Sequence, residues 1–100
     1  EVSLPEASAW RDRQPVLVDD IISSARTMIE AVGSLRRVGL AAPVCIGVHA
    51  LFAPGAHEDL LASGAARVVT CDTVAHPSNG IGVAEPMARA LAQRLADRLG

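Results

Sequence analysis

Apolar residues along the chain alternate between short continuous runs and helically spaced positions. A continuous apolar run occupies residues 16–18, and the segments 44–48 and 67–71 are also expected to be strands. Runs of this kind are typical of strands that are covered on both faces by other parts of a protein. The pattern therefore predicts three buried strands, the first of them ending at Val18.

Three further segments have the spacing of helices. The segment 27–38 carries apolar residues three or four positions apart and is followed by Gly39, and the segment 57–63 is followed by Gly64; glycine commonly terminates a helix. Residues 72–82 are rich in turn formers and are expected to form a loop. The last helix is expected to begin near Glu85, to tolerate Pro86 in its first turn, and to bury Met87, Leu91, Leu95 and Leu99.

The order strand, helix, strand, helix, strand, helix predicts an α/β fold: a parallel sheet with flanking helices and right-handed crossovers. In such sheets, ligands bind beyond the carboxyl ends of the strands, and three polar groups follow the expected strands there: Asp19 with Asp20, His49, and Asp72 with Thr73. A three-stranded parallel sheet is thin, so the pattern suggests a partial domain.

Composition excludes several classes of function. The chain has 100 residues, a net charge of −2 and only two aromatic residues, Trp10 and Phe52, so neither the basic surface nor the stacking rings of a nucleic-acid platform are present. No apolar run has the ~20 residues that a membrane span needs, and no signal-peptide pattern opens the sequence. A soluble, cytoplasmic protein is expected.

Because the first residue is Glu1 rather than Met, we also expect the chain to be the back part of a longer protein.

Cys45 and Cys71 are the only cysteines, and both lie in apolar runs without metal-ligand spacing. They are expected to be buried thiols in a reducing compartment, and no metal site is predicted from them.

The segment around Asp19 and Asp20 has the strongest chemical signal; residues 15–27 read PVLVDDIISSART. Adjacent carboxylates repel each other, so an opposing group must compensate them. A hydroxyl-rich turn that opens a helix presents free N–H groups and the positive end of the helix dipole, which suits a phosphate. Ionised carboxylates accept hydrogen bonds from vicinal hydroxyls. Together these features predict a sugar-phosphate site, although strand-end and helix-capping roles explain such residues about equally well when each is taken alone.

These residues carry a resemblance to a known family. VLVDDIISSARTM resembles the phosphoribosyl-diphosphate (PRPP) loop of the type I phosphoribosyltransferase fold, and HALFAPGAHEDLLASGAARVVTCDT followed by HPSN is similar to the C-terminal half of ribose-phosphate pyrophosphokinases. The resemblance extends in order from Val16 to about Leu91.

The resemblance implies a role for each of these positions. Asp19 and Asp20 match the carboxylates that hold the ribose hydroxyls, and the loop that surrounds the 5-phosphate is matched by Ser23, Ser24, Ala25, Arg26 and Thr27. It further implies diphosphoryl transfer from ATP to C1 of ribose 5-phosphate, with Mg as cofactor and a homo-oligomer as the assembly. The N-terminal half, with the ATP site and most Mg ligands, has no counterpart in this sequence, so no catalytic residue is assigned and the isolated chain is expected to be inactive.

The sequence departs from the family pattern at Ala25 and Arg26, where two glycines are common. Alanine restricts the backbone, and arginine either crowds the loop or adds a cation to it.

His49 and His57 are expected to be scaffold residues, Asp72 and Thr73 to cap a loop or organise an interface, and residues 76–80 to form a turn. Charged residues of the last helix are expected to face solvent: Arg89, Arg94, Asp97 and Arg98.

Three other classes of protein would use some of the same residues. A phosphorylated receiver domain needs a lysine at a later strand end, and this sequence has none, which makes that class a remote alternative. A phosphoribosyltransferase that consumes PRPP would use the same loop but needs a base-recognition segment. A non-catalytic, regulatory homologue of the synthetase would keep the fold without the activity.

Overall fold

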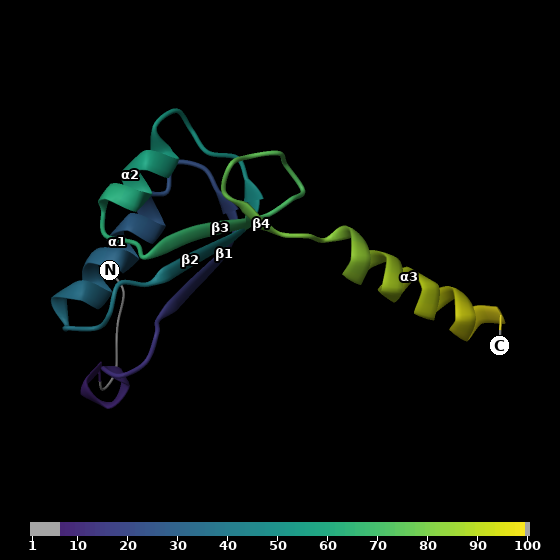
Figure 1. Cartoon of the computed structure of the whole chain (residues 1–100), viewed down its shortest axis with the longest axis horizontal. Helices are drawn as coiled ribbons and strands as arrows, with labels where there is room; N and C mark the ends of the chain where they lie inside the picture. Colours follow the sequence, from purple (N-terminus) through teal and green to yellow (C-terminus); the bar gives the residue numbers. More distant parts are fainter. Residues whose placement is uncertain (1–6, 100) are drawn as a thin grey trace.

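The computed structural model describes residues 7–99, which form a four-stranded sheet with helices (Figure 1). Its strands are β1 (Val16–Ile22), β2 (Val44–Ala50), β3 (Arg67–Cys71) and β4 (Asn79–Ile81). Its helices are a 3-10 turn (Ala7–Trp10), α1 (Arg26–Arg37), α2 (Ala56–Ala62) and α3 (Ala84–Leu99). The strands lie in the order β1-β2-β3-β4, and each neighbouring pair is parallel. The predicted α/β class with a parallel sheet is confirmed.

Glycines end the first two helices as the sequence predicts. At the end of α1, Gly39 has a φ of 85°, its N–H donates to the Arg36 carbonyl, and the Leu40 N–H donates to the Leu35 carbonyl at 3.1 Å. This is the glycine-terminated pattern that satisfies the last carbonyls of a helix. Gly64 follows α2 with a φ of 112°, a backbone angle that other residues rarely adopt.

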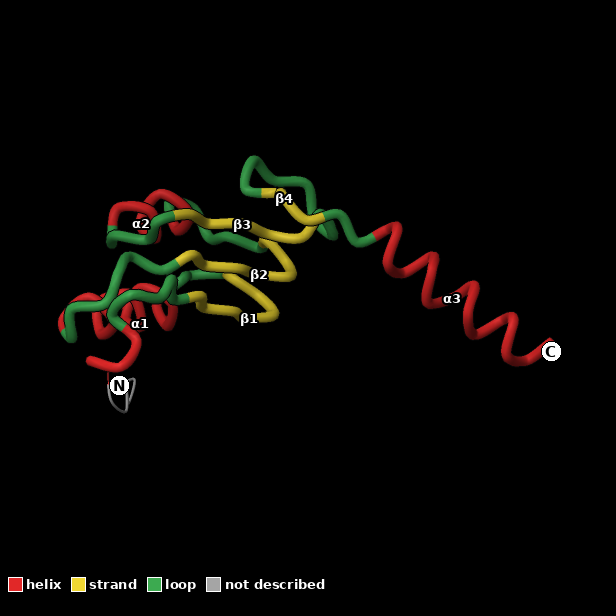
Figure 2. Tube along the Cα trace, turned by 60° about the horizontal axis from the view of Figure 1, so that its bottom comes forward, coloured by secondary structure: helices red, strands yellow, loops and turns green. Residues whose placement is uncertain are grey.

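The hydrophobic core lies between the sheet and the two crossover helices. Its central side chains come from both helices and two strands, and Val32, Cys45 and Leu60 are fully buried among them. Both α1 and α2 cover the same side of the sheet, as Figures 1 and 2 show. This follows from the strand order, because successive right-handed crossovers that step in one direction place their helices on one face.

The other side of the sheet is an apolar surface, which we call the open face. Leu17, paired with Cys45, points toward the helices and packs in the core, so its neighbours along β1 point the opposite way. Val16 and Val18 are 52 % and 70 % exposed. By strand register, the open face consists of Val16, Val18, Val44, Ile46 and Val69. The expectation that the first strand is covered on both faces is therefore wrong for the described residues, since both crossover helices lie on the other side.

Two elements near the C-terminus also differ from the sequence prediction. The segment 72–82 is not entirely a loop, because Asn79–Ile81 pairs with the end of β3 as a fourth strand. The last helix does form, but its apolar residues are not buried: Met87, Leu91, Leu95 and Leu99 are 66 %, 62 %, 52 % and 88 % exposed. Helical spacing identified an apolar side of α3 correctly, but the helix projects away from the sheet (Figure 1). The Cα radius of gyration is accordingly 16.6 Å, above the ~13 Å of a compact domain of this length.

Both cysteines are free and buried, as predicted. Burial raises the pKa of the Cys45 thiol, which favours the neutral thiol over the thiolate. Across residues 7–99, every helix is too short or too polar to cross a membrane.

The position of the core gives a first prediction. Leu60 is fully buried, whereas the adjacent Leu61 is 43 % exposed. Leu60→Ala should lower the free energy of unfolding by about 2–5 kcal/mol because it leaves a cavity, and Leu61→Ala should change it by about 0.5 kcal/mol. Urea denaturation of both variants would test this; equal losses would contradict the described packing of α2.

Candidate functional site

The two aspartates lie within β1, not beyond its end. Because β1 continues to Ile22, the expected strand end at Val18 is wrong: backbone pairing with β2 carries the strand through both acidic residues. Asp19 pairs with Gly47 and therefore shares the helix-covered side of the sheet, whereas Asp20 is on the opposite side. Each carboxylate accepts the next backbone N–H, with 2.8 Å from Asp20 N to Asp19 Oδ1 and 2.9 Å from Ile21 N to Asp20 Oδ1.

The loop from Ser23 to Ala25 connects β1 to α1 through a left-handed turn. Ala25, at the position before the helix, has a φ of 64° and a ψ of 10° and is 7 % exposed. No side chain caps α1; the Arg26 N–H has only a long contact of 3.4 Å to Ser24 Oγ. The first N–H groups of a helix have no partner within it, so this end of α1 presents donors and positive potential.

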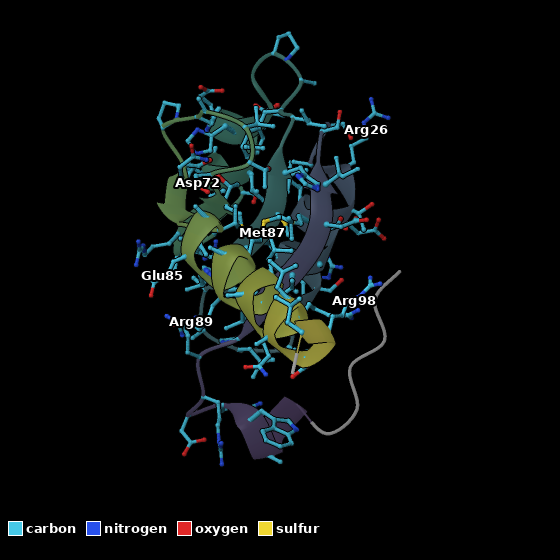
Figure 3. The ribbon with its side chains drawn as sticks, turned by 90° about the vertical axis from the view of Figure 1, so that its right-hand side faces the viewer. Arg26, Asp72, Glu85, Met87, Arg89 and Arg98 are labelled. Atoms are coloured by element: carbon cyan, nitrogen blue, oxygen red, sulfur yellow. The ribbon has the colours of Figure 1, made fainter. Side chains whose placement is uncertain are left out.

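The strand and the loop together enclose a hollow of about 160 Å³. Asp19, Ile21 and Ile22 of β1 line it together with the loop and first turn of α1, from Ser23 to Met28. The hollow thus brings together Asp19, Ser23, Ser24, Ala25, Arg26 and Thr27, while Asp20 is outside its lining. Arg26 is exposed and lies at the edge of the molecule (Figure 3).

The carboxyl ends of β2 and β3 are joined by side-chain contacts. His49 Nδ1 lies 2.7 Å from Thr73 Oγ1, and that hydroxyl donates to the Val48 carbonyl at 3.2 Å. Asp72 accepts the Val83 N–H at 3.0 Å, a loop-capping role. The expected common rim is therefore confirmed for His49 and Thr73.

A larger hollow of about 480 Å³ adjoins this rim and was not found from the sequence. Phe52, His57 and His76 line it and pack together, with ring centroids 4.7–5.1 Å apart. The Ala53 N–H donates to the Ser23 carbonyl at 2.9 Å, which ties this loop to the loop of the smaller hollow. No sequence signal places His57 beside His76, because they are 19 positions apart and meet only through the fold.

The turn predicted for residues 76–80 is confirmed only as far as Ser78, because Asn79 and Gly80 belong to β4. His76 Nδ1 accepts the Ser78 N–H at 3.0 Å, and Asn79 Oδ1 accepts the His76 N–H at 3.0 Å. Asn79 also donates to the hydroxyl of the fully buried Thr70, at 2.9 Å. These bonds fix the position of the rim beside the larger hollow.

The sequence of this chain matches a known family over most of its length. The model of the phosphoribosyl transferase domain matches residues 3–89. The chain belongs to the phosphoribosyl transferase domain family. The matched residues include β1, the loop from Ser23 to Ala25 and the lining of the smaller hollow.

Curated relatives of this phosphoribosyl transferase domain include three named ribose-phosphate pyrophosphokinase. The protein of Methanopyrus kandleri is 40 % identical over 79 residues, which are 79 % of this chain and 27 % of that protein. The protein of Sulfurisphaera tokodaii is 34 % identical over 70 residues, which are 70 % of this chain and 24 % of that protein. The protein of Corynebacterium glutamicum is 38 % identical over 65 residues, which are 65 % of this chain and 20 % of that protein. These similarities confirm the resemblance found from the sequence, and the chain spans about a quarter of the length of these relatives.

The left-handed turn of this phosphoribosyl transferase domain gives a second prediction. A non-glycine residue at positive φ costs about 1–2 kcal/mol, and removing a buried methyl group costs about 0.8 kcal/mol. Ala25→Gly should therefore raise the free energy of unfolding by up to about 1 kcal/mol. Ala31, in the interior of α1, is equally buried at 7 % exposure, and Ala31→Gly should lower it by about 1 kcal/mol or more.

Each variant loses one equally buried methyl group, so the difference between them reports the effect of the backbone angle. Thermal and urea unfolding of both variants measure this difference. A loss of stability in Ala25→Gly as large as that in Ala31→Gly would contradict the described turn.

Proposed function

We propose that this chain forms the sugar-phosphate-binding part of a ribose-phosphate diphosphokinase, which transfers a diphosphoryl group from ATP to C1 of ribose 5-phosphate and releases AMP. The observation that carries the proposal is the 160 Å³ hollow, which is lined by both Asp19 and the uncapped start of α1. One ligand with hydroxyls at one end and a phosphate at the other fits both sides of this hollow.

In this proposal the loop binds the 5-phosphate. The first N–H groups of α1 and the hydroxyls of Ser23, Ser24 and Thr27 donate to the phosphate oxygens, and the exposed Arg26 supplies a positive charge. Ala25 already holds the backbone angle that the turn requires, with a φ of 64°, so alanine in place of glycine does not prevent the loop from forming.

The carboxylates bind the other end of the sugar. Asp19 lines the hollow and is placed to accept a ribose hydroxyl from within it. Asp20 points to the other side of the sheet, so its proposed contact with the ribose is at the edge of the strand. Holding both ends of the sugar fixes the direction of its anomeric hydroxyl, and positioning of this kind is the main protein contribution to phosphoryl transfer.

Magnesium, which the family resemblance implies, would neutralise charge on the diphosphate. Residues 7–99 contain no group of three or more His, Cys, Asp or Glu placed to hold a metal ion, and the two aspartates lie on opposite sides of the sheet. We therefore propose that most ligands for the metal, and the residues that bind ATP, come from parts of the relatives that this chain does not match.

Two alternatives use the same hollow. A phosphoribosyltransferase that consumes PRPP would also need to bind a base, and the aromatic residues of the larger hollow are a candidate surface for it. A regulatory homologue would bind the sugar phosphate without turnover. Both retain the sugar-phosphate contacts and differ from the proposed enzyme in activity.

A third prediction concerns the carboxylates. Asp19→Asn keeps the Oδ1 acceptor of the Asp20 N–H but loses the charge, so the fold should persist while affinity for ribose 5-phosphate falls about tenfold or more. Asp20→Asn alone should have a smaller effect, and the double variant should resemble Asp19→Asn and be slightly more stable than the parent because the repulsion is removed.

Calorimetric titration with ribose 5-phosphate measures the affinities, a thermal melt measures stability, and Asp97→Asn on α3 is the matched control. Unchanged affinity in the double variant would remove both aspartates from the site.

A fourth prediction concerns the activity of the chain by itself. It should bind ribose 5-phosphate or PRPP weakly and release no AMP from Mg-ATP and ribose 5-phosphate, because it lacks the surface that would align the nucleotide and exclude water. The same assay on a full-length ribose-phosphate pyrophosphokinase is the positive control. Robust turnover by this chain, abolished in the double variant of Asp19 and Asp20, would show that the additional length of the relatives is dispensable.

A further inference from the structure

His76 occupies a hydrogen-bonding position that suits only the neutral form of its ring. Its Nδ1 accepts the backbone N–H of Ser78 at 3.0 Å and lies 2.7 Å from Ser78 Oγ. Because a backbone N–H can only donate, Nδ1 carries no proton in this arrangement. A doubly protonated ring would direct an N–H of its own at the Ser78 N–H, so the turn as described is incompatible with the charged form of His76.

The hydrogen bonds around His76 involve buried groups. Ser78 is 8 % exposed and Thr70 is fully buried, and their hydroxyl oxygens lie 2.7 Å apart. Asn79 holds both ends of the turn, because its Oδ1 accepts the His76 N–H at 3.0 Å and its Nδ2 donates to Thr70 Oγ1 at 2.9 Å. A buried donor that loses its acceptor destabilises the arrangement that contains it. Protonation of His76 therefore favours a rearranged turn.

The ring of His76 also packs on the loop between β2 and α2. Its centroid lies 4.7 Å from that of Phe52 and 4.9 Å from that of His57. Phe52 and Ala53 in turn pack against the core cluster that contains Ala25, the left-handed residue before α1. A rearranged turn thus withdraws a packing partner from the loop that carries Phe52 and Ala53.

A backbone hydrogen bond connects that loop to the candidate phosphate loop. The Ala53 N–H donates to the Ser23 carbonyl at 2.9 Å, and Ser23 lines the smaller hollow. The contacts from His76 to the smaller hollow are therefore contiguous: a ring contact to Phe52, one peptide unit to Ala53, and one hydrogen bond to Ser23. Energetic coupling between sites is carried by contiguous contacts of this kind.

We infer that His76 is a positioning residue for the phosphate loop, and that it holds this loop in place only while its ring is neutral. The inference rests on the proposed sugar-phosphate site. Histidine ordinarily changes its charge between about pH 5 and pH 8. Because the form that binds sugar phosphate holds no extra proton on His76, the affinity is greatest at the upper end of this range and falls as the pH falls.

Two other titratable groups line the larger hollow beside His76. They are His57 and Glu58, both in the first turn of α2. On the segment that carries His76, Asp72 accepts the Val83 N–H. A change of charge at His57 or Glu58 must therefore be separated from a change of charge at His76 by substitution.

Four variants make this separation. Asparagine commonly accepts the backbone N–H two residues further on, so His76→Asn keeps an acceptor for Ser78 but takes up no proton in this range. His76→Ala removes the acceptor altogether. His57→Asn is the matched control, because it removes the neighbouring ring, whose described contacts are ring packing with Phe52 and His76. Glu58→Gln removes the carboxylate of the same hollow.

Calorimetric titration with ribose 5-phosphate at about pH 8 and about pH 5.5 measures the effect across the range in which histidine titrates. The ligand's phosphate takes up a proton near about pH 6, which contributes equally to every variant. Beyond this shared change, the affinity of the parent should fall about fivefold or more, the scale of one lost buried hydrogen bond. That of His76→Asn should not fall further relative to its own value at pH 8, whereas His57→Asn and Glu58→Gln should follow the parent. His76→Ala should bind about fivefold more weakly than the parent already at pH 8.

Amide hydrogen exchange gives a measurement that needs no ligand. Corrected for the pH dependence of intrinsic exchange, the protection of the Ser78 and Ala53 amides should fall together on acidification of the parent and should persist in His76→Asn. Circular dichroism at both pH values shows that the fold is retained. If the parent does not bind ribose 5-phosphate at all, the sugar-phosphate proposal fails, and amide protection alone decides whether His76 positions the loop.

Three outcomes would overturn the inference. The parent and His76→Asn would show the same dependence on pH if the charge of His76 had no effect on the loop. Loss of protection at Ser78 without loss at Ala53 would show that the turn rearranges without moving the neighbouring loop. A dependence on pH that disappears in His57→Asn or Glu58→Gln would assign the effect to α2.

Discussion

The sequential order of the parallel strands determines the rest of this structure. Because each right-handed crossover steps to the next strand in the same direction, α1 and α2 must both lie on one side of the sheet. That side receives the buried residues, including Leu60 and Val32, and the other side is left as the open face. The same order aligns the carboxyl ends of the strands along one edge, where the loops after β1, β2 and β3 line the two hollows.

The features that depend on local sequence could be predicted. Runs of apolar residues located β2 and β3 closely, and the glycines at positions 39 and 64 marked the ends of α1 and α2. The errors concern interactions between distant segments. Acidic residues are rare in strands, so β1 was expected to stop at Val18, but pairing with β2 extends it to Ile22. Likewise β4 depends on backbone pairing with β3 and on the side-chain bonds of Asn79, which join it to β3.

In the candidate site, too, the features that depend on local sequence could be predicted and the interactions between distant segments could not. The resemblance located the loop from Ser23 to Thr27, and the structure brings this loop together with Asp19 in one hollow. The sequence could not show that Asp20 points elsewhere, because that follows from where β1 begins and ends. The cluster of Phe52, His57 and His76 could not be predicted either, since His76 follows β3 and meets the other two rings only in the folded chain. The helical spacing of α3 identified an apolar side but contained no information on what covers it.

Because α3 is anchored through Asp72, a change in angle at the base of the helix moves its far end. Asp72 directly precedes Thr73, whose hydroxyl contacts His49, so the base of the helix is connected to the edge of the sheet where the loops meet. Because α3 is ~24 Å long and continues straight from this point, a tilt of about 10° at its base would move its far end by roughly 4 Å. A small rotation of the loop after β3 would therefore displace the far end of α3 by several ångströms.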